Sequence, residues 1–207
     1  MTKTKSDQRS LIADLLDAHG ETYAAQAKIA LADKPSPLYQ LLVLANLLSA
    51  RISADVAVAA ARELFRAGYR TPEKMSAATW QHRVDALGRG HYKRYDERTA
   101  TMLGDGADLL IERWGGDLRR LRDEAGGDVR RIRDLLTAFP GIGATGADIF
   151  LREVQIVWPQ VAPYVDERVR QETKSVGLPS TGRALSGLVG STAELVRLES
   201  ALMRARS

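Results

Sequence analysis

The chain has 207 residues, of which 44% are hydrophobic and 27% are charged, a composition typical of a globular protein with a sizeable core. It contains no cysteine, which excludes disulfides, thiolate metal sites and cysteine-ligated iron–sulfur clusters. The net charge is only +4, but 23 of the 30 basic residues are arginine. Arginine binds phosphate in a bidentate way, so nucleic acid is a candidate partner; a GC-rich genome explains the same excess equally well.

Helical periods interrupted by glycine and proline follow one another along the whole chain, and no run alternates as a strand would. We expect helices over residues 8–20, 21–32, 38–50, 53–67, 79–86, 95–114, 128–138 and 144–157, a short one that begins at Thr71-Pro72-Glu73, and a helical tail from residue 183. The pattern therefore predicts an all-α protein of about ten helices.

The segment 38–50 is apolar nearly all round, as expected for the buried central helix of a domain. Residues 37–134 could form one helical lobe around it, and residues 1–36 with 135–207 a second lobe. No apolar run is long enough to span a bilayer, and the polar start MTKTKSDQRS is no secretory signal. A cytoplasmic protein with no membrane partner is the expectation.

The turn FPGIG, from Phe139 to Gly143, joins two of the predicted helices. Glycines at 141 and 143 remove side chains that would block approach to the backbone. The N–H groups at the start of the next helix can then bind an anion such as phosphate, while Ile142 points inward. A tight turn between two helices, with glycine as a C-cap, is an equally good explanation of FPGIG alone.

FPGIG resembles the DNA-binding helix–hairpin–helix motif, whose pattern is LPGVGxxTA. LLSARIS at residues 47–53 is similar to the LLSAQxT segment of the endonuclease III family of DNA glycosylases, and Trp158-Pro159 and Val165-Asp166 match its Trp-Pro and Val-Asp in order. The resemblance covers about residues 37–170. It implies a two-lobed helix–hairpin–helix DNA glycosylase fold, with the motif at 135–157 in the second lobe and the active site in the cleft between lobes.

The resemblance also assigns the chemistry. The family's catalytic lysine is replaced by Thr145, whose hydroxyl cannot form a Schiff base, so it implies a monofunctional glycosylase that uses water. Asp166 matches the catalytic aspartate, whose charge would stabilise the developing sugar cation. A helix N-cap is the commoner use of such an aspartate. Asp148 on the second hairpin helix is a rival acid, with a solvated helix carboxylate as the simpler explanation.

Double-stranded DNA is the implied partner, bound by a monomer. Besides Gly141, Ile142, Gly143 and Thr145, the candidate contacts are Arg51, in place of a glutamine that fills the gap left by a flipped base, and Arg89, His91, Tyr92 and Lys93 of the loop 88–95. That loop interleaves aromatic and basic residues; an exposed loop without a ligand is the alternative. Trp80, Trp114 and Trp158 are interpreted as core.

No protein-held metal or cofactor is expected, because the family's iron–sulfur cysteines are absent and the histidines are isolated from acidic pairs. In relatives, the hairpin carbonyls can hold a monovalent cation, so Na+ or K+ there is a further candidate. The predicted function is monofunctional excision of a damaged or mismatched base, in base excision repair. Ala45 replaces the second acid of adenine glycosylases, which disfavours mismatched adenine. The alternative is a non-catalytic DNA-binding protein on the same scaffold.

Overall fold

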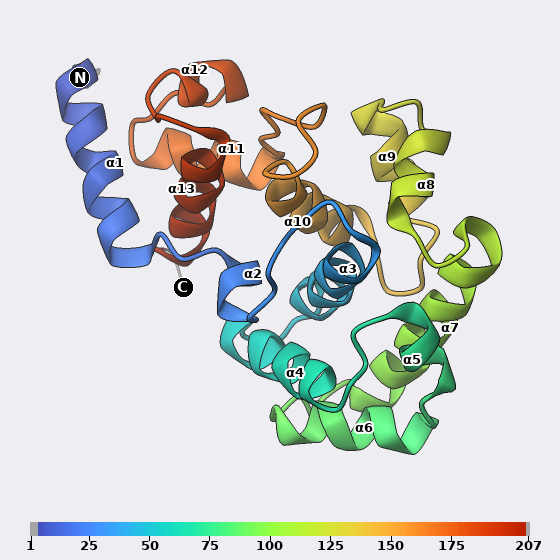
Figure 1. The fold of residues 1–207 in the computed structure, drawn as a ribbon. Coiled ribbons are helices and arrows are strands. Elements are labelled where there is room, and N and C mark those ends of the chain that lie inside the picture. The colour runs from blue at the N-terminus through green and yellow to red at the C-terminus, as the bar shows by residue number, and fades with distance from the viewer. Residues whose placement is uncertain (1–3, 206–207) are drawn as a thin grey trace. The chain divides into compact units, whose positions relative to one another are not determined.

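The structure is a computed structural model that describes residues 4–205, and this range is all-α, with thirteen helices and no strand. The helices are α1 (Lys5–His19), α2 (Tyr23–Gln26), α3 (Pro35–Ser49), α4 (Ala54–Arg66), α5 (Pro72–Ala77), α6 (Trp80–Arg89), α7 (Asp96–Trp114), α8 (Leu118–Glu124), α9 (Val129–Leu136), α10 (Ala144–Val154), α11 (Glu167–Ser175), α12 (Gly182–Ser186) and α13 (Thr192–Arg204) (Figure 1). The predicted all-α class is confirmed.

The residue contacts divide the chain into two units, and the boundaries differ from the lobes expected from the sequence. Unit 2 runs from Ala24 to Phe150, and unit 1 joins the N-terminal segment up to Tyr23 with the chain from Leu151 onward. The helix–hairpin–helix turn therefore belongs to the central bundle. The reason is that α3 hydrogen-bonds the turn directly, a long-range contact that sequence spacing does not reveal.

Unit 2 is built around α3. Every residue from Leu38 to Leu47 is buried, as a helix that is apolar all round requires. α4 packs against α3, and α7 packs against both α5 and α6 (Figure 1). The hydroxyl groups of Ser53, Thr71 and Thr79 each accept a hydrogen bond from the first turn of the helix they open, which fixes where α4, α5 and α6 begin.

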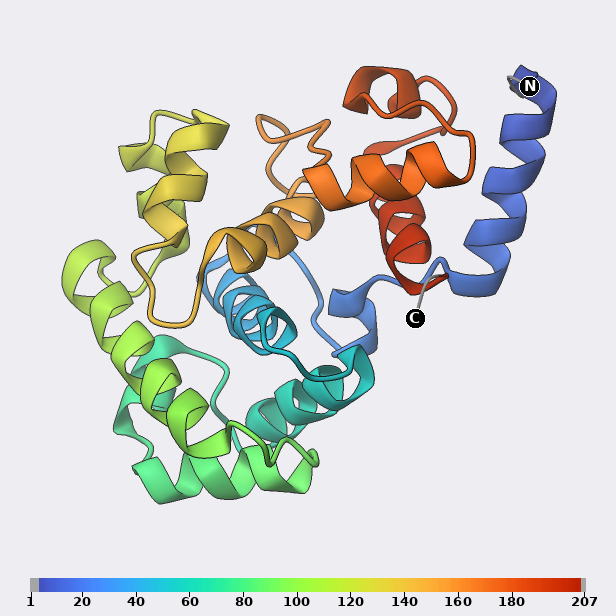
Figure 2. The ribbon, with the colours of Figure 1, turned by 180° about the vertical axis from the view of Figure 1, so that it is seen from behind.

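Unit 1 brings the two ends of the chain together. α1 lies alongside α13, and α11 packs against α13 from another side (Figures 1 and 2). Their shared core consists of Ile12, Leu16, Val165, Val169, Leu178, Leu185, Leu195, Leu198 and Leu202. Helices as short as α1 and α13 are marginal in water by themselves, so each supplies the apolar surface that the other needs.

Several helices differ from the sequence-based expectation. The helix expected over 21–32 shortens to α2, because Lys28 takes a left-handed conformation (φ 60°) and the Ile29 N–H bonds back to the Ala24 carbonyl at 2.9 Å. α8 has no counterpart among the helices predicted from the sequence, and the predicted helical tail is interrupted between α12 and α13. Trp80 is 41% exposed, so its assignment to the core was wrong, whereas Trp114 and Trp158 are buried.

Candidate nucleic-acid interface

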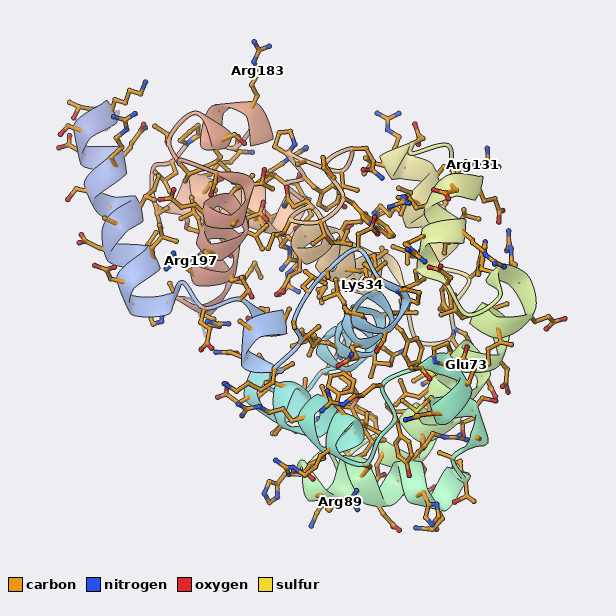
Figure 3. The ribbon with its side chains drawn as sticks, viewed as in Figure 1. Lys34, Glu73, Arg89, Arg131, Arg183 and Arg197 are labelled. Carbon is orange, nitrogen blue, oxygen red and sulfur yellow. The ribbon has the colours of Figure 1, made fainter. Side chains whose placement is uncertain are left out.

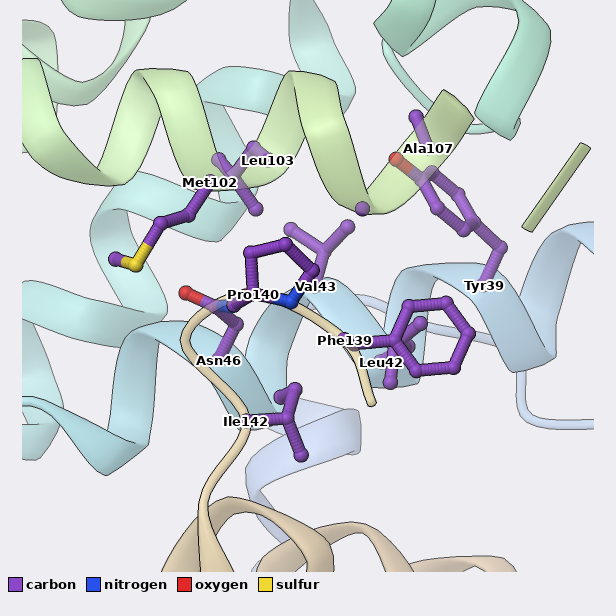
Figure 4. Close-up of a pocket in the computed structure, with 11 residues that line it drawn as sticks. Tyr39, Leu42, Val43, Asn46, Met102, Leu103, Ala107, Phe139, Pro140 and Ile142 are labelled. Atoms are coloured by element: carbon purple, nitrogen blue, oxygen red, sulfur yellow. The ribbon is translucent and has the colours of Figure 1, made fainter. Parts of the chain in front are cut away.

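The turn between α9 and α10 is fastened to α3 by two carbonyl groups. Asn46 Nδ2 donates to the Pro140 carbonyl at 2.9 Å, and Ser49 Oγ lies 3.2 Å from the Gly141 carbonyl oxygen. Ile142 is buried at 3% exposure, and its side chain points from the turn toward the residues of α3 (Figure 4). The inward position predicted for Ile142 is confirmed, and the turn is held from inside by packing and hydrogen bonds.

The two glycines of the turn serve different purposes. Gly141 has φ +82°, and a Cβ there would lie 2.6 Å from Asn46 Nδ2. Glycine is therefore required at 141 by the fold itself. At Gly143 the φ is ordinary and a Cβ would meet nothing within 4 Å. No packing inside the protein explains glycine at 143, and the missing side chain leaves the backbone at the start of α10 open.

A small cavity lies under the turn and a larger pocket beside it. The small cavity is lined by Phe139, Pro140 and Ile142 of the turn together with residues of α3 and α7 (Figure 4). The larger pocket, of about 320 Å³, is lined by Asn46, Ser49, Ala50, Arg51, Tyr92, Tyr95, Arg98, Thr99, Met102 and Gly141. All of these residues belong to unit 2. Arg51, which was singled out from the sequence, is an exposed residue that lines this pocket.

The loop expected over residues 88–95 is shorter than predicted, since α6 extends to Arg89. His91 and Lys93 are exposed, and His91 takes a left-handed conformation with φ 63°. Tyr92 differs from the expectation of an exposed stacking residue. It is 1% exposed, its hydroxyl lies 3.2 Å from Thr99 Oγ1, and burial raises its pKa, so the phenol remains protonated.

Many arginine side chains on the surface are paired with carboxylates. Arg89 Nε lies 3.4 Å from Glu63 Oε2, and its side chain projects outward at α6 (Figure 3). Arg131, on the helix that leads into the turn, also projects outward (Figure 3) and is exposed. A cation without a local carboxylate can bind phosphate without first breaking an ion pair.

Asp166, the predicted catalytic acid, lies in unit 1 as the N-cap of α11. Its Oδ1 accepts from the backbone N–H groups of Arg168 at 2.8 Å and Val169 at 3.2 Å. Its Oδ2 accepts from Arg152 Nε at 2.5 Å, and both side chains of this ion pair are more than nine-tenths buried. The capping role considered for this residue is confirmed, and it coexists with a buried ion pair that the sequence did not reveal.

A network of buried polar groups surrounds this ion pair. Gln155 Nε2 donates to Glu199 Oε2 at 3.0 Å, and Gln155 Oε1 accepts from the Tyr164 N–H at 2.9 Å. Burial raises the pKa of Glu199 well above its usual range, against the opposing effect of Arg152. Arg152 Nη2 and Glu199 Oε1 are buried without a hydrogen-bond partner. Such a network concentrates charge where solvent is excluded.

Asp148 is tied into unit 2 by a bidentate ion pair. Arg133 Nε and Nη2 donate to its two carboxylate oxygens at 2.7 and 3.2 Å, which joins α9 to α10 across the turn. The carboxylate is half-buried, so it is not the fully solvated helix residue that the sequence suggested. Thr145, one turn earlier on α10, is also half-buried. This ion pair gives Asp148 a structural task.

Within residues 4–205, no group of three or more histidine, aspartate or glutamate side chains could hold a metal ion. No helix in the same range has the length and apolarity needed to cross a membrane.

Comparison with known proteins decides the fold. No family model and no curated protein matches the sequence. A solved non-covalent complex of endonuclease III with DNA matches with a TM-score of 0.56 and 18% identity, over 97% of this chain and 85% of that one. The fold is that of endonuclease III. A trapped covalent endonuclease III–DNA intermediate, with an estranged adenine, matches with a TM-score of 0.51 and 18% identity, over 94% of this chain and 84% of that one.

Several residues at these two sites were not singled out from the sequence. Asn46, Ser49 and Arg98 line the larger pocket, while Arg152 and Glu199 are buried around Asp166. Two signals were available. Arg98 follows Tyr95 at the i+3 spacing of one helix face, and Glu199 stands in the otherwise small and apolar stretch of residues 198–202. The partner of Asp166 had no such signal.

Proposed function

We propose that this protein is a monofunctional DNA glycosylase, which removes a damaged or mismatched base from double-stranded DNA in base excision repair. The observation that carries the proposal is the open backbone at Gly143, where glycine is not required by the fold. Backbone N–H groups at the start of a helix bind phosphate, because they lack partners within the helix and lie at the positive end of its dipole. The endonuclease III fold supports this reading of the turn.

Water would be the nucleophile in this reaction. The side chain two residues after Gly143 is Thr145, which has no amine to attack the sugar, and no lysine lies between Lys93 and Lys174. Loss of the base leaves positive charge on the deoxyribose, which a fixed carboxylate stabilises. Asp166 is the carboxylate that we propose for this task. Its position is set by the two N–H groups that it caps and by Arg152.

The ion pair of Asp166 also favours a second candidate, a DNA-binding protein on this fold without glycosylase activity. A carboxylate that neutralises a buried guanidinium has less charge to offer a developing cation than a solitary one. The two candidates share the turn and its phosphate contacts and differ only in chemistry, so one assay separates them.

The turn offers little support for the candidate Na+ or K+ site. Three carbonyl oxygens of the turn already accept a hydrogen bond: that of Pro140 from Asn46, and those of Phe139 and Gly143 from backbone N–H groups. A bound cation would have to share these oxygens. No step of the proposed reaction depends on it.

The test is excision on a panel of duplexes that each carry one lesion or mismatch, with and without alkali. We expect at least one substrate to give an intact abasic strand that breaks only after alkali. Borohydride should trap no covalent protein–DNA adduct, because the site supplies no amine for an imine. A trapped adduct would contradict monofunctional chemistry. Tight duplex binding with no excision on any substrate would establish the non-catalytic candidate.

A further inference from the structure

The buried acids of unit 1 outnumber the buried cations that accompany them. Among residues 4–205, the buried acidic side chains are Glu153, Asp166 and Glu199, and all three belong to unit 1. Within the same described range, this unit buries one cationic side chain, Arg152. If all of these groups were charged, part of the negative charge would be buried without a counterion, which is far costlier than a neutral acid. At least one of the three carboxyl groups therefore holds a proton.

The hydrogen bonds assign this proton to Glu199. Asp166 accepts from the Arg152 guanidinium and from two backbone N–H groups of α11, a set of donors that favours the carboxylate. Glu153 Oε1 accepts from the backbone N–H at the start of α2 at 2.8 Å. Glu199 has the weakest support for a charge, because its Oε2 accepts from the neutral amide of Gln155 and its Oε1 is buried without a partner. Burial accordingly raises the pKa of Glu199 well above its usual range.

The amide of Gln155 determines which oxygen of Glu199 holds the proton. Gln155 Oε1 accepts from the Tyr164 N–H at 2.9 Å, so its Nε2 is the atom that faces Glu199 Oε2, at 3.0 Å. Because Oε2 accepts this bond, the proton belongs on Oε1. A buried hydroxyl without a partner costs much less than a buried anion without one.

Arg152 has an unused donor in the same cluster. Its Nε donates to Asp166, whereas its Nη2 is buried without a hydrogen-bond partner. The positive charge of Arg152 also opposes the effect of burial on the pKa of Glu199, so the two side chains interact. An ionised Glu199 would therefore compete with Asp166 for one guanidinium.

The charged groups that act on Glu199 are Arg152 and Glu153 of α10 and Asp166 at the start of α11. The helices packed against α13 are α1, α11 and α12. The charged side chains of α1 and α12 are all exposed, and those within α11 are exposed or half-buried. The protonation of Glu199 is thus linked to the ion pair of Asp166 rather than to other charges on these helices.

We propose that Glu199 is a positioning residue for Asp166 and acts on it through Arg152. While Glu199 holds its proton, the guanidinium is committed to Asp166. When that proton passes to water, Glu199 becomes a second carboxylate acceptor for Arg152, at Nη2. Asp166 is then less neutralised and offers more charge to a developing cation. The inference rests on the proposed function in taking Asp166 as the catalytic carboxylate, but the link between Glu199 and Arg152 can be observed without DNA.

The first experiment is NMR of the full chain without DNA, from about pH 5 to about pH 9. It follows the carboxyl carbon of Glu199, identified by its absence from Glu199→Gln, and the Nε–H signal of Arg152. Both signals should move with one shared midpoint in wild type, and the Arg152 signal should not move in Glu199→Gln. Glu194→Gln is the matched control on the same helix, where Glu194 accepts from the Gly190 N–H at 2.7 Å. It should titrate as wild type does.

The second experiment is single-turnover excision over the same pH range. Excision by wild type should rise by about tenfold across the midpoint found by NMR, the size expected for one added charge that acts through the protein. Glu199→Gln has a permanently neutral side chain and should keep the low-pH rate throughout. Glu194→Gln should follow wild type. A residue with a merely structural task would change the rate at every pH alike, so the shape of the profile identifies the positioning role.

Three outcomes separate the possible failures. An Arg152 signal that ignores pH in wild type, or that still titrates in Glu199→Gln, would overturn the link between the two residues. Linked titration with the same pH profile of excision in wild type and Glu199→Gln would overturn the positioning role. Linked titration in a protein that excises no base would support the link and overturn only the glycosylase reaction. Circular dichroism of each variant confirms that it is folded.

Discussion

Arg152 and Asp166 form an ion pair that is almost completely withdrawn from water. Removing two charges from water is costly, and their mutual attraction offsets this only with good geometry and further hydrogen bonds. Asp166 has both, because two backbone N–H groups of α11 also donate to it. Breaking such a pair by changing one partner leaves an uncompensated buried charge, so either residue should matter for stability whatever the protein does to DNA.

The variants Asp166→Asn and Arg152→Gln separate chemistry from stability. Asparagine at 166 can still cap α11, but it leaves Arg152 without a carboxylate partner. Glutamine at 152 leaves Asp166 without its guanidinium partner. Each variant should therefore lower the free energy of unfolding by about 3–5 kcal/mol. Only Asp166→Asn removes the carboxylate charge that would stabilise the developing sugar cation, and this loss should slow excision by about a hundred- to a thousandfold. Urea unfolding and single-turnover excision, at a temperature where both variants are folded, measure the two effects.

Asp148→Asn is the control at a second acid, and it should leave excision nearly intact because Asp148 is occupied by Arg133. Excision that survives in Asp166→Asn but disappears in Asp148→Asn would show that Asp148 is the catalytic acid. Equal loss in Asp166→Asn and Arg152→Gln would reduce Asp166 to a structural residue.

Glu199 makes the stability of unit 1 depend on pH. Burial raises its pKa in the folded state, whereas in the unfolded chain a glutamate titrates near 4.3. The folded state therefore holds a proton that the unfolded state releases, and stability from this group is present below the unfolded pKa and lost as pH rises through the folded pKa. The loss is at most about 1.4 kcal/mol for each pH unit within that window.

Glu199→Gln should remove this pH dependence while keeping a hydrogen-bonding side chain of similar size. The difference in unfolding free energy between variant and wild type, measured in urea from pH 5 to pH 8, should shift in favour of the variant as pH rises. A difference that stays constant over this range would mean that Glu199 keeps the same protonation state in the folded and unfolded chains.

At the scale of elements, the helix ends differ in whether a group of the protein itself caps them. α4, α5 and α6 begin at hydroxyl caps, and α7 ends at Gly115, whose φ of 60° a side chain would strain. The start of α10 differs, because its neighbour Gly143 is open on the outside. The start of α10 is therefore the helix start to test for binding, because no contact within the protein requires glycine at 143.

Gly143→Asp tests the open end of α10. The added side chain has room in the folded protein, so stability should change little, but its charge would repel a phosphate at the helix start. Affinity for duplex DNA should fall by about tenfold or more, the loss expected for a charge-assisted contact, and equally for all sequences. Gly143→Ala adds a Cβ without charge and serves as the control; fluorescence anisotropy measures both. Affinity unchanged in a folded Gly143→Asp would reduce FPGIG to a plain turn.

The backbone just after α6 lies very close to α4 at Gly90. A Cβ on Gly90 would lie 2.4 Å from the Cα of Ala60 in α4, whereas one on Gly88 would meet nothing within 4 Å. Gly90→Ala should therefore cost about 1–3 kcal/mol through overpacking. Gly88→Ala, inside the last turn of α6, should be neutral or stabilise by up to about 1 kcal/mol. Equal unfolding free energies for the two variants would contradict this account of Gly90.

At the scale of the whole molecule, the net charge is only +4, and many arginines of residues 4–205 are already paired with carboxylates. The contacts expected with DNA come from a few unpaired arginines and from backbone N–H groups. Affinity for undamaged duplex, measured from 50 to 200 mM salt, should fall with a log–log slope of about −3 or steeper, because counterions leave the neutralised phosphates. A slope near zero would show that phosphates do not carry the binding.

The sequence by itself determined the helical class, most helix starts and the hairpin, since these depend on local signals: hydrophobic period, hydroxyl caps and paired glycines. It also excluded a lysine-dependent step at Thr145. Tertiary structure alone decided that Arg152 pairs with Asp166, that Tyr92 is buried, that Trp80 is exposed, and that the hairpin belongs to the bundle around α3. These facts depend on which side chains far apart in the chain come within a few ångströms of one another, and the energy of a buried charge or ring is set by those neighbours rather than by its own residue type.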